Sequence, residues 1–191
     1  MMTHTVKVQP RLVTVQEYER MVQSGVFPKA ERLEMIEGQI VSLAAASASI
    51  ASVVKRLDAL LANGTTAQLL VSVHDPIRLA RSELQPDLVL LRLRDDNYFG
   101  GPPSASDVLL VIEVADTSAD YDRNVKIPVY GRGGIAEAWL IDLSARAIQV
   151  YREPGNDGYG VQKTVAAGDQ LSPLALPDIS LSVSEILGAA A

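Results

Sequence analysis

Asp107-Val-Leu-Leu-Val-Ile-Glu-Val-Ala115 is the stretch around which the rest of the chain is organised. It holds a single carboxylate, Glu113, within an otherwise unbroken apolar run that is rich in β-branched residues. Such a run, placed between a Pro/Ser-rich loop and Asp-Thr-Ser-Ala, predicts a strand that is buried on both faces. An ionised carboxylate in such a strand is costly unless a cation, hydrogen bonds or a metal compensates for it. Glu113 is therefore the first candidate site residue.

A second apolar segment, Gln85 to Leu91, carries one carboxylate, Asp87, at its entrance. If the two segments are antiparallel neighbours joined by a loop over 92–106, the start of one strand meets the end of the other. Asp87 and Glu113 then lie side by side at one edge of the sheet. Two close carboxylates repel each other and raise at least one pKa unless a cation neutralises them. This arrangement favours a divalent metal.

The composition sets limits on the class of protein. A chain of 191 residues predicts a single domain over 1–191, long enough to bury a core. There are no cysteines, which excludes disulfides and thiolate metal sites and fits a cytoplasmic protein. No apolar run predicts a signal peptide or a membrane span. The net charge of −6 argues against a sequence-independent grip on nucleic acid, although a local basic patch near an acidic metal centre remains compatible with it.

Helical and strand patterns alternate along the chain and predict an α/β fold. Helices are expected at 14–24, 47–63 and 120–132, with one further turn at 184–187. Strands are expected at 32–43 as a hairpin turning at Glu37-Gly38, and at 69–73, 77–80, 136–142, 147–152 and 159–165. In the 120–132 helix, Asp120 is placed near the N-cap, and Asp122 and Lys126 share a face. Pro128 predicts a kink or a break there.

Several short pieces, in their order and spacing, resemble the Uma-type restriction endonuclease family, a branch of the PD-(D/E)XK nuclease superfamily. The resemblance runs roughly from Leu12 to Leu187. The matching pieces are Thr14-Val-Gln-Glu-Tyr18, Arg32-Leu-Glu-Met-Ile-Glu-Gly38, Gln85-Pro-Asp-Leu88, Ile112-Glu-Val114, Asp122-Arg-Asn-Val-Lys126, Tyr130 and Glu137-Ala-Trp-Leu-Ile-Asp142.

The resemblance implies a restriction-endonuclease-like core, with a mixed central β-sheet flanked by helices and a C-terminal antiparallel strand extension. It also implies a Mg²⁺- or Mn²⁺-dependent enzyme that hydrolyses phosphodiester bonds in DNA. Asp87, Glu113 and the backbone carbonyl of Val114 would bind the metal, and Glu34 would complete or orient the site. The superfamily lysine usually follows the second acid by two residues, where this chain has Ala115, and Lys126 on the next helix matches it instead.

Three departures from the family pattern bear on activity. Gln39 stands where an acid is frequent, an Ala/Ser-rich segment at 44–50 replaces a Pro/Ser-rich turn followed by histidine, and Pro128 lies just after Lys126. The alternative function is therefore a catalytically inactive nuclease-fold protein that acts as a binding or interaction module. For an active enzyme we expect a homodimer, because cutting both strands of a duplex calls for two sites.

Each candidate residue also has a purely structural interpretation. Glu113 could be a buried acid paired with Lys126 and nothing more, and Asp87 could cap a turn after Pro86. Glu34 could be a half-exposed strand residue, and Lys126 a solvated lysine paired with Asp122. The remaining expectations are packing for Tyr130, a core position with a partnered indole for Trp139, and surface or loop positions for His4 and His74.

Overall fold

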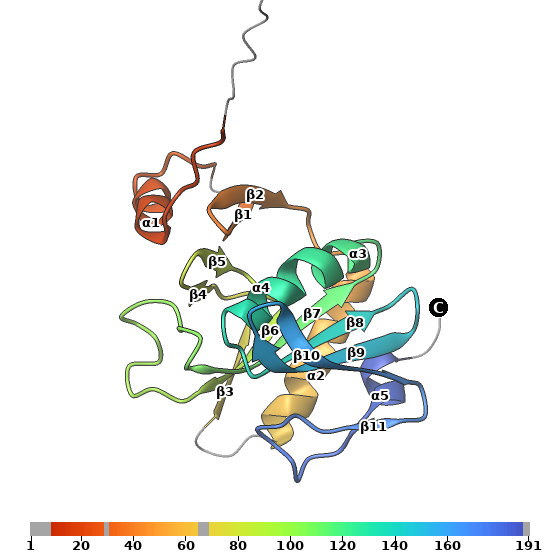
Figure 1. Ribbon diagram of the computed structural model, residues 1–191. Helices are drawn as coiled ribbons and strands as arrows, with labels where there is room; N and C mark the ends of the chain where they lie inside the picture. Colours follow the sequence, from red (N-terminus) through yellow and green to blue (C-terminus); the bar gives the residue numbers. More distant parts are fainter. Residues whose placement is uncertain (1–8, 29–30, 65–68, 189–191) are drawn as a thin grey trace, which may run out of the picture.

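The computed structural model describes residues 9–28, 31–64 and 69–188, and a six-stranded sheet forms its centre (Figure 1). Its strands are β3 (Leu69–Val73), β6 (Leu88–Arg92), β7 (Val108–Ala115), β8 (Glu137–Asp142), β9 (Ala147–Gly155) and β10 (Gly158–Ala166). They lie in the order β10-β9-β8-β7-β6-β3. β7 pairs antiparallel with β6 and parallel with β8, so the sheet is mixed, as the sequence predicts.

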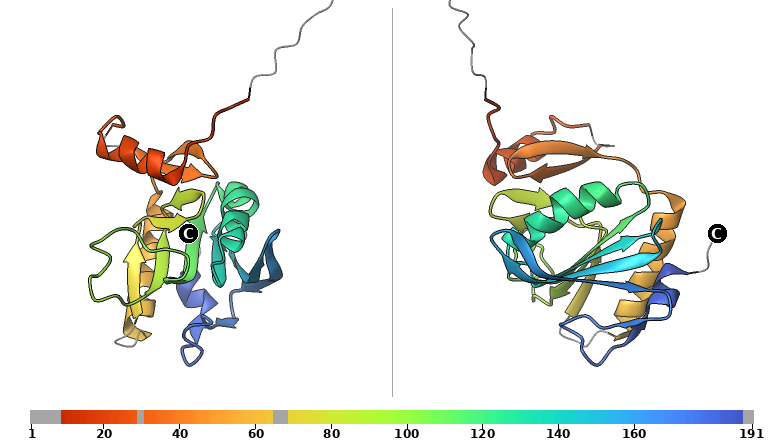
Figure 2. Two further views of the ribbon diagram at one scale, coloured as in Figure 1. Left: turned by 60° about the vertical axis from the view of Figure 1, so that its left-hand side comes forward. Right: turned by 45° about the vertical axis from the view of Figure 1, so that its right-hand side comes forward.

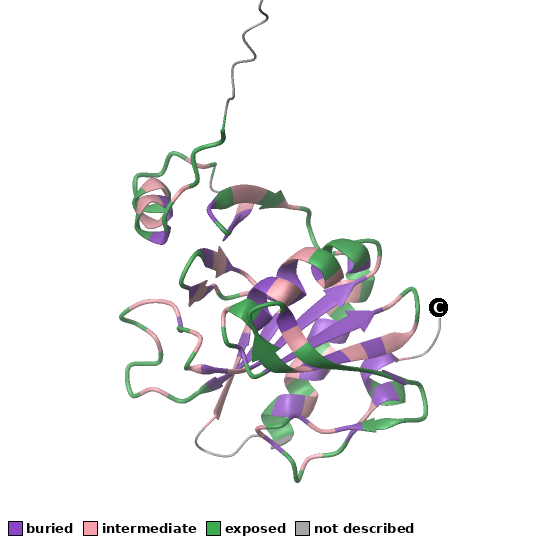
Figure 3. Cartoon of the chain, in the orientation of Figure 1, coloured by how far each residue is buried: buried purple, intermediate pink, exposed green. Residues whose placement is uncertain are grey.

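β7 lies inside the sheet and is buried over almost its whole length (Figure 3). Because side chains alternate between the two faces of a strand, its apolar residues supply two separate cores. Leu110, Ile112 and Val114 belong to the core on one face, whereas Val111 and Ala115 belong to the core on the other. Glu113 therefore shares its face with Val111 and Ala115.

Two helices cover the first of these faces (Figure 2). They are α2 (Ala48–Gly64) and α5 (Val183–Leu187). Val53, Leu57 and Leu61, spaced four apart on α2, are buried against the sheet. The Asn63-Gly64 stop expected for this helix agrees with its last residue.

The helical segment over 119–132 covers the opposite face, where Glu113 lies. It consists of α3 (Ala119–Tyr121), a π-helical stretch η1 (Asp122–Lys126) and α4 (Ile127–Arg132). The segment begins one residue earlier than the sequence suggests, because Ser118 rather than Asp120 occupies the N-cap. Asp120 lies within the first turn instead.

The expected irregularity at Pro128 takes the form of a widened turn just before it. The N–H of Ile127 donates to the carbonyl of Asp122, five residues earlier. Pro128 then falls in the first turn of α4, where a missing N–H costs little. Such wide turns often occur at functional sites. This one spans Asp122 and Lys126, which are both buried.

A second, smaller sheet lies beside α4 and carries the N-terminal helix (Figure 2). It is built from β1 (Arg32–Ile36), β2 (Gln39–Leu43), β4 (Ile77–Leu79) and β5 (Ser82–Leu84) in the order β2-β1-β5-β4. The β1–β2 hairpin turns at Glu37-Gly38 as expected, whereas β5 has no counterpart among the strands expected from the sequence. α1 (Val15–Gln23) starts at Thr14, which forms a capping box with Glu17, and it packs on Met35 through Tyr18.

The C-terminal part adds β9 and β10 to the main sheet, followed by the short pair β11 (Gln170–Leu171) and β12 (Leu181–Ser182). In the part of the chain that the structure describes, no helix is long and apolar enough to cross a membrane.

Candidate functional site

Strand pairing brings Asp87 and Glu113 to the same place. Leu88, the first residue of β6, pairs with Ile112 on β7, so the preceding Asp87 lies across from Glu113. Both acids share a face with Val89 and Val111, because those neighbours on the two strands pack in the same core. The sequence prediction that antiparallel pairing would place the two acids at one sheet edge is confirmed.

Asp87 is held by the backbone of the neighbouring strand. Its Oδ2 accepts the N–H of Val114 at 2.8 Å. Asp87 therefore bonds to the strand across from it, which the turn-capping alternative does not account for.

Glu113 is only 3% exposed, and its Oε1 is the acceptor for two donors. The Nζ of Lys126 lies 2.6 Å from Oε1, and the hydroxyl of Tyr130 donates to the same oxygen. Tyr130 is fully buried, so it contributes packing as expected and also this hydrogen bond. The two contacts come from η1 and α4 and set the orientation of the carboxylate against the helical layer.

Glu34 joins this cluster from the smaller sheet. Its Oε1 accepts the backbone N–H of Gln85 at 2.8 Å and lies 3.1 Å from the Nζ of Lys126. The side chain is fully buried, so the half-exposed alternative is wrong. Among the described residues its second oxygen, Oε2, has no hydrogen-bond partner.

Lys126 bridges the two glutamates and is 4% exposed, so the solvated alternative is wrong as well. Asp122 does not pair with it and instead accepts the hydroxyl of Ser118 at 2.9 Å. Burial alone would lower the pKa of Lys126, but the charges of Glu113 and Glu34 outweigh it and raise that pKa. The two glutamates therefore favour the charged ammonium form of Lys126.

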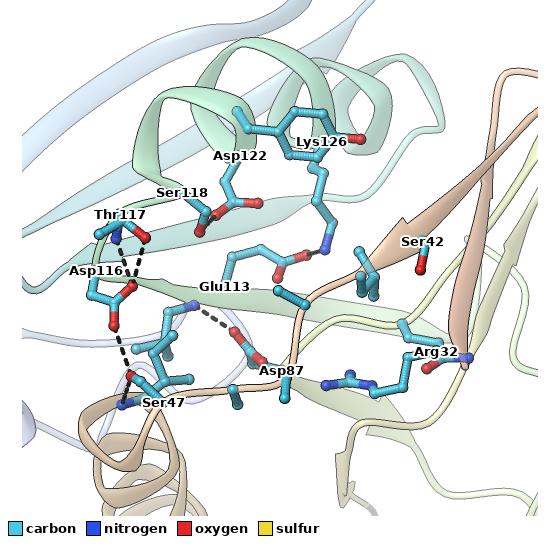
Figure 4. Close-up of a pocket in the computed structure, with 18 residues that line it drawn as sticks. Arg32, Ser42, Ser47, Asp87, Glu113, Asp116, Thr117, Ser118, Asp122 and Lys126 are labelled. Atoms are coloured by element: carbon cyan, nitrogen blue, oxygen red, sulfur yellow. Dashed lines mark hydrogen bonds and ion pairs between the residues drawn. The ribbon is translucent and has the colours of Figure 1, made fainter. Parts of the chain in front are cut away.

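A cavity of about 530 Å³ opens over these side chains (Figure 4). One wall is the 44–47 segment that leads into α2, and the other is the turn over 116–118 with α3. Its charged lining residues are Arg32, Asp87, Glu113, Asp116, Asp122 and Lys126. Gln39, at the position where the family often has an acid, is exposed and does not line this cavity.

Two acids that line the cavity, Asp87 and Asp122, hold protons more tightly than free carboxylates do. Burial, followed by repulsion from Glu113, raises the pKa of Asp87 to about 7. The same two causes raise the pKa of Asp122 to about 7. Burial also raises the pKa of Glu34, against the opposing effect of Lys126. Neighbouring carboxyl groups whose pKa values are all raised are typical of functional sites, and a bound cation would favour their ionised forms.

Three residues near the site were not identified as site residues from the sequence: Arg32, His74 and Asp122. The Nε2 of His74 lies 3.3 Å from the Oδ1 of Asp87, yet it forms no hydrogen bond among the described residues. His74 follows β3 in a loop, as expected, and Val73 pairs with Leu88, so pairing of β3 with β6 is the signal that places it beside Asp87. His4 lies outside the described residues.

The donors at this edge fit a hard divalent cation. Among the described residues no group of three or more His, Cys, Asp or Glu side chains could hold a metal. Two carboxylates, Asp87 and Glu113, nevertheless face the same cavity. The backbone carbonyl of Ala115 faces β8, where it accepts the N–H of Leu143, so the carbonyl of Val114 is directed to the Asp87 side. Mg²⁺ suits such a set because it binds few protein ligands and keeps water or phosphate oxygens.

Comparisons with known proteins agree with this architecture. The sequence profile of a family described as "Uma2: Putative restriction endonuclease" matches residues 15–184. A search among curated proteins found no match. Among solved structures, the chain is similar to a protein of Anabaena variabilis described as a putative nuclease belonging to DUF820. The TM-score is 0.71 at 14% identity, over 92% of this chain and 97% of that chain, and at this identity the likeness supports the fold.

The family profile covers the pieces that carry Glu34, Asp87, Glu113 and Lys126, and it confirms the resemblance noted in the sequence. By this match, the chain belongs to the Uma2 family of restriction-endonuclease-like proteins.

Proposed function

We propose that this protein is a Mg²⁺- or Mn²⁺-dependent nuclease that hydrolyses phosphodiester bonds in DNA. The observation that carries the proposal is the placement of Asp87 and Glu113 on adjacent strands, facing one cavity, with Lys126 bonded to Glu113. Membership of the restriction-endonuclease-like family supports the same reaction.

In this proposal Asp87, Glu113 and the carbonyl of Val114 bind the metal. A bound Mg²⁺ would lower the pKa of a coordinated water and stabilise negative charge on the phosphoryl oxygens. The Val114 N–H holds Oδ2 of Asp87, so we assign the ion to the other oxygen, Oδ1, which lies 3.3 Å from Nε2 of His74. Glu113 is held through Oε1 alone, which leaves Oε2 for the ion.

Lys126 and Glu34 act together in the proposed reaction. An ammonium has three N–H donors, and Glu113 and Glu34 accept from Lys126, so one donor remains for a water or a phosphate oxygen. We assign this donor to orienting the attacking water and offsetting the charge that develops on the phosphate. Glu34 is then the residue that positions Lys126, through a carboxylate that is itself fixed by the Gln85 N–H.

A cleavage assay tests the proposal. Purified protein is incubated with Mg²⁺ or Mn²⁺ and with supercoiled, linear duplex or single-stranded DNA. We expect cleavage that EDTA stops and that Asp87→Ala reduces to background. Asp95→Ala removes a carboxylate from an exposed loop outside the cavity and should retain wild-type activity. Absence of cleavage with every substrate, or full activity in Asp87→Ala, would rule the proposal out.

A catalytically inactive binding module is the second candidate. It is favoured by Oε1 of Glu113, which is already satisfied by two protein donors and does not need a metal. Calorimetric titration with Mn²⁺ separates the two candidates. Binding that is lost in Glu113→Gln supports the nuclease, whereas no binding by the wild-type protein supports the inactive module.

We also propose that the active form is a homodimer, since cutting a duplex on both strands calls for two sites. Light scattering over a range of protein concentrations measures the mass directly. A monomer at all concentrations would remove the homodimer from the proposal.

A further inference from the structure

Arg32 is a cation in the cavity that the proposed chemistry has not yet used. It is the first residue of β1, pairs with Leu43 on β2, and lines the cavity while partly buried. Figure 4 shows its side chain reaching toward Asp87 from the smaller sheet, while Glu113 and Lys126 meet each other nearby. The cavity therefore holds two positive groups, Arg32 and Lys126, close to the two acids.

Among the described residues the guanidinium of Arg32 forms no ion pair and no hydrogen bond, and its charge acts on Asp87 only from a longer distance, where it lowers the pKa of that acid. The contrast with other arginines is clear. Ion pairs are formed by Arg78 with Glu83, Arg94 with Asp96, Arg123 with Asp142 and Arg152 with Glu137. A partly buried guanidinium gives up hydration without gaining a protein acceptor, so an acceptor from outside is favoured at this position.

The surrounding wall leaves room for such an acceptor. Beyond Arg32 and Ser42 the cavity is bordered by Ala44, Ala45 and Ala46, whose side chains are single methyl groups. These residues connect β2 to α2 and carry no charge of their own. A chain of phosphate groups could lie along this wall with one group at the acids and Arg32 beside it.

We propose that Arg32 binds a non-bridging phosphate oxygen of the nucleic-acid strand, next to the metal-binding acids. This inference rests on the proposed function, and it adds a substrate-binding residue to it. Guanidinium matches the geometry of a phosphate group and keeps its charge at every working pH. Lys126 has only one donor left for the substrate, because Glu34 and Glu113 already accept from two of its three. In this proposal Lys126 mainly contacts Glu34 and Glu113, whereas Arg32 contacts the substrate.

The simplest competing role is that Arg32 only offsets the negative charge of the cavity. In that case its removal would weaken folding or change metal binding, and would leave the salt dependence of DNA binding unchanged. A phosphate contact has the opposite signature, because each contact releases about one counterion from duplex DNA. The salt dependence of binding therefore distinguishes the two roles.

The experiment measures fluorescence anisotropy of a labelled DNA duplex over a series of KCl concentrations, with Ca²⁺ replacing Mg²⁺. Arg32→Gln should raise the Kd about tenfold and reduce the slope of log K against log salt by about 0.9. Arg32→Lys should restore the slope and only part of the affinity. Arg81→Gln removes the same charge from an exposed turn outside the cavity and should behave as the wild-type protein does. Mn²⁺ titration and urea unfolding should be unchanged in all three variants.

Equal Kd and slope in Arg32→Gln and Arg81→Gln would overturn the inference and leave the proposed nuclease untouched. DNA binding that depends on Arg32, without cleavage, would support the inference while the proposed hydrolysis fails. If the wild-type protein binds Mn²⁺ but no DNA, both are overturned. Inorganic phosphate is titrated as a competitor: displacement of DNA at equal micromolar concentration would identify free phosphate as the ligand and overturn the assignment to a nucleic acid.

Discussion

Lys126 Nζ lies 2.6 Å from Glu113 Oε1, and both side chains are almost wholly buried. The same ammonium also contacts Glu34, so three charged groups share a small volume between the two sheets and the helical layer. Buried charges are tolerated only when they are paired, and removal of one partner leaves the others uncompensated. The cluster therefore couples the stability of the fold to the integrity of the proposed site.

The first prediction concerns Lys126→Met. We expect it to lower the free energy of unfolding by about 3–5 kcal/mol at pH 8, because two buried acids lose their cation. The loss should be smaller at pH 5, since the raised pKa of Glu34 lets that group take up a proton. The free energy of unfolding is measured by urea unfolding followed by the fluorescence of the single tryptophan, Trp139. Lys55→Met, on the exposed side of α2, is the matched control, and an equal loss there would contradict the prediction.

The second prediction concerns Asp122 and pH. Its pKa is about 7 in the folded protein, because of burial and Glu113, with Asp87 adding to the effect and Lys126 and the Ser118 hydroxyl opposing it. The unfolded value is near 3.9, so the folded state binds more protons between these pH values. Stability that is fully present below about pH 4 is therefore lost as the pH rises through about 7.

Asp122→Asn keeps an acceptor for Ser118 but has no charge to bury. We expect it to stabilise the metal-free protein at pH 8 by about 2–4 kcal/mol and to flatten the pH dependence of unfolding between pH 5 and 8. Urea unfolding in EDTA at several pH values is the measurement. An unchanged slope of stability against pH would show that Asp122 does not titrate in this window.

The third prediction concerns the hydroxyl of Tyr130, which donates to Glu113. Tyr130→Phe should lower the free energy of unfolding by about 1–3 kcal/mol, because a buried carboxylate loses a donor. It should also weaken Mn²⁺ binding, since Glu113 then has one contact fewer to orient it. Tyr159→Phe is the control, because the buried hydroxyl of Tyr159 has no hydrogen-bond partner among the described residues. Removing the Tyr159 hydroxyl should leave the free energy of unfolding unchanged or raise it. Similar decreases in the free energy of unfolding of both variants would contradict the prediction.

The fourth prediction separates a structural acid from the proposed site acids. Glu137 is fully buried, but it accepts hydrogen bonds from Trp139, Arg152 and the backbone N–H of Leu174, and it does not line the cavity. Glu137→Gln should cost about 2–4 kcal/mol of stability because the charge on Arg152 loses its partner. Mn²⁺ titration should remain as in the wild-type protein. Weakened Mn²⁺ binding in this variant would mean that the titration reports folding rather than the site.

Local sequence patterns were sufficient for most of the architecture. The apolar run ending at Ala115 predicted a fully buried strand, since only a strand covered on both faces needs so many apolar residues in succession. Asp87 lies at the start of its predicted strand, and Glu113 lies near the end of its own. In an antiparallel pair the start of one strand lies beside the end of the other, so the sequence predicts that the two acids are neighbours. The kink or break expected at Pro128 takes the form of a widened turn over 122–127, directly before the proline.

Tertiary structure alone decided how the site is assembled. The burial of Glu34 and its contact with Lys126 depend on how the smaller sheet packs against the helical layer, which no local pattern contains. The same packing brings Arg32 to the cavity, where it forms no ion pair with any described residue, and pairing of β3 with β6 places His74 beside Asp87. Local patterns report periodicity and turn chemistry within a segment, whereas the desolvation and pairing of charges depend on which distant segments meet.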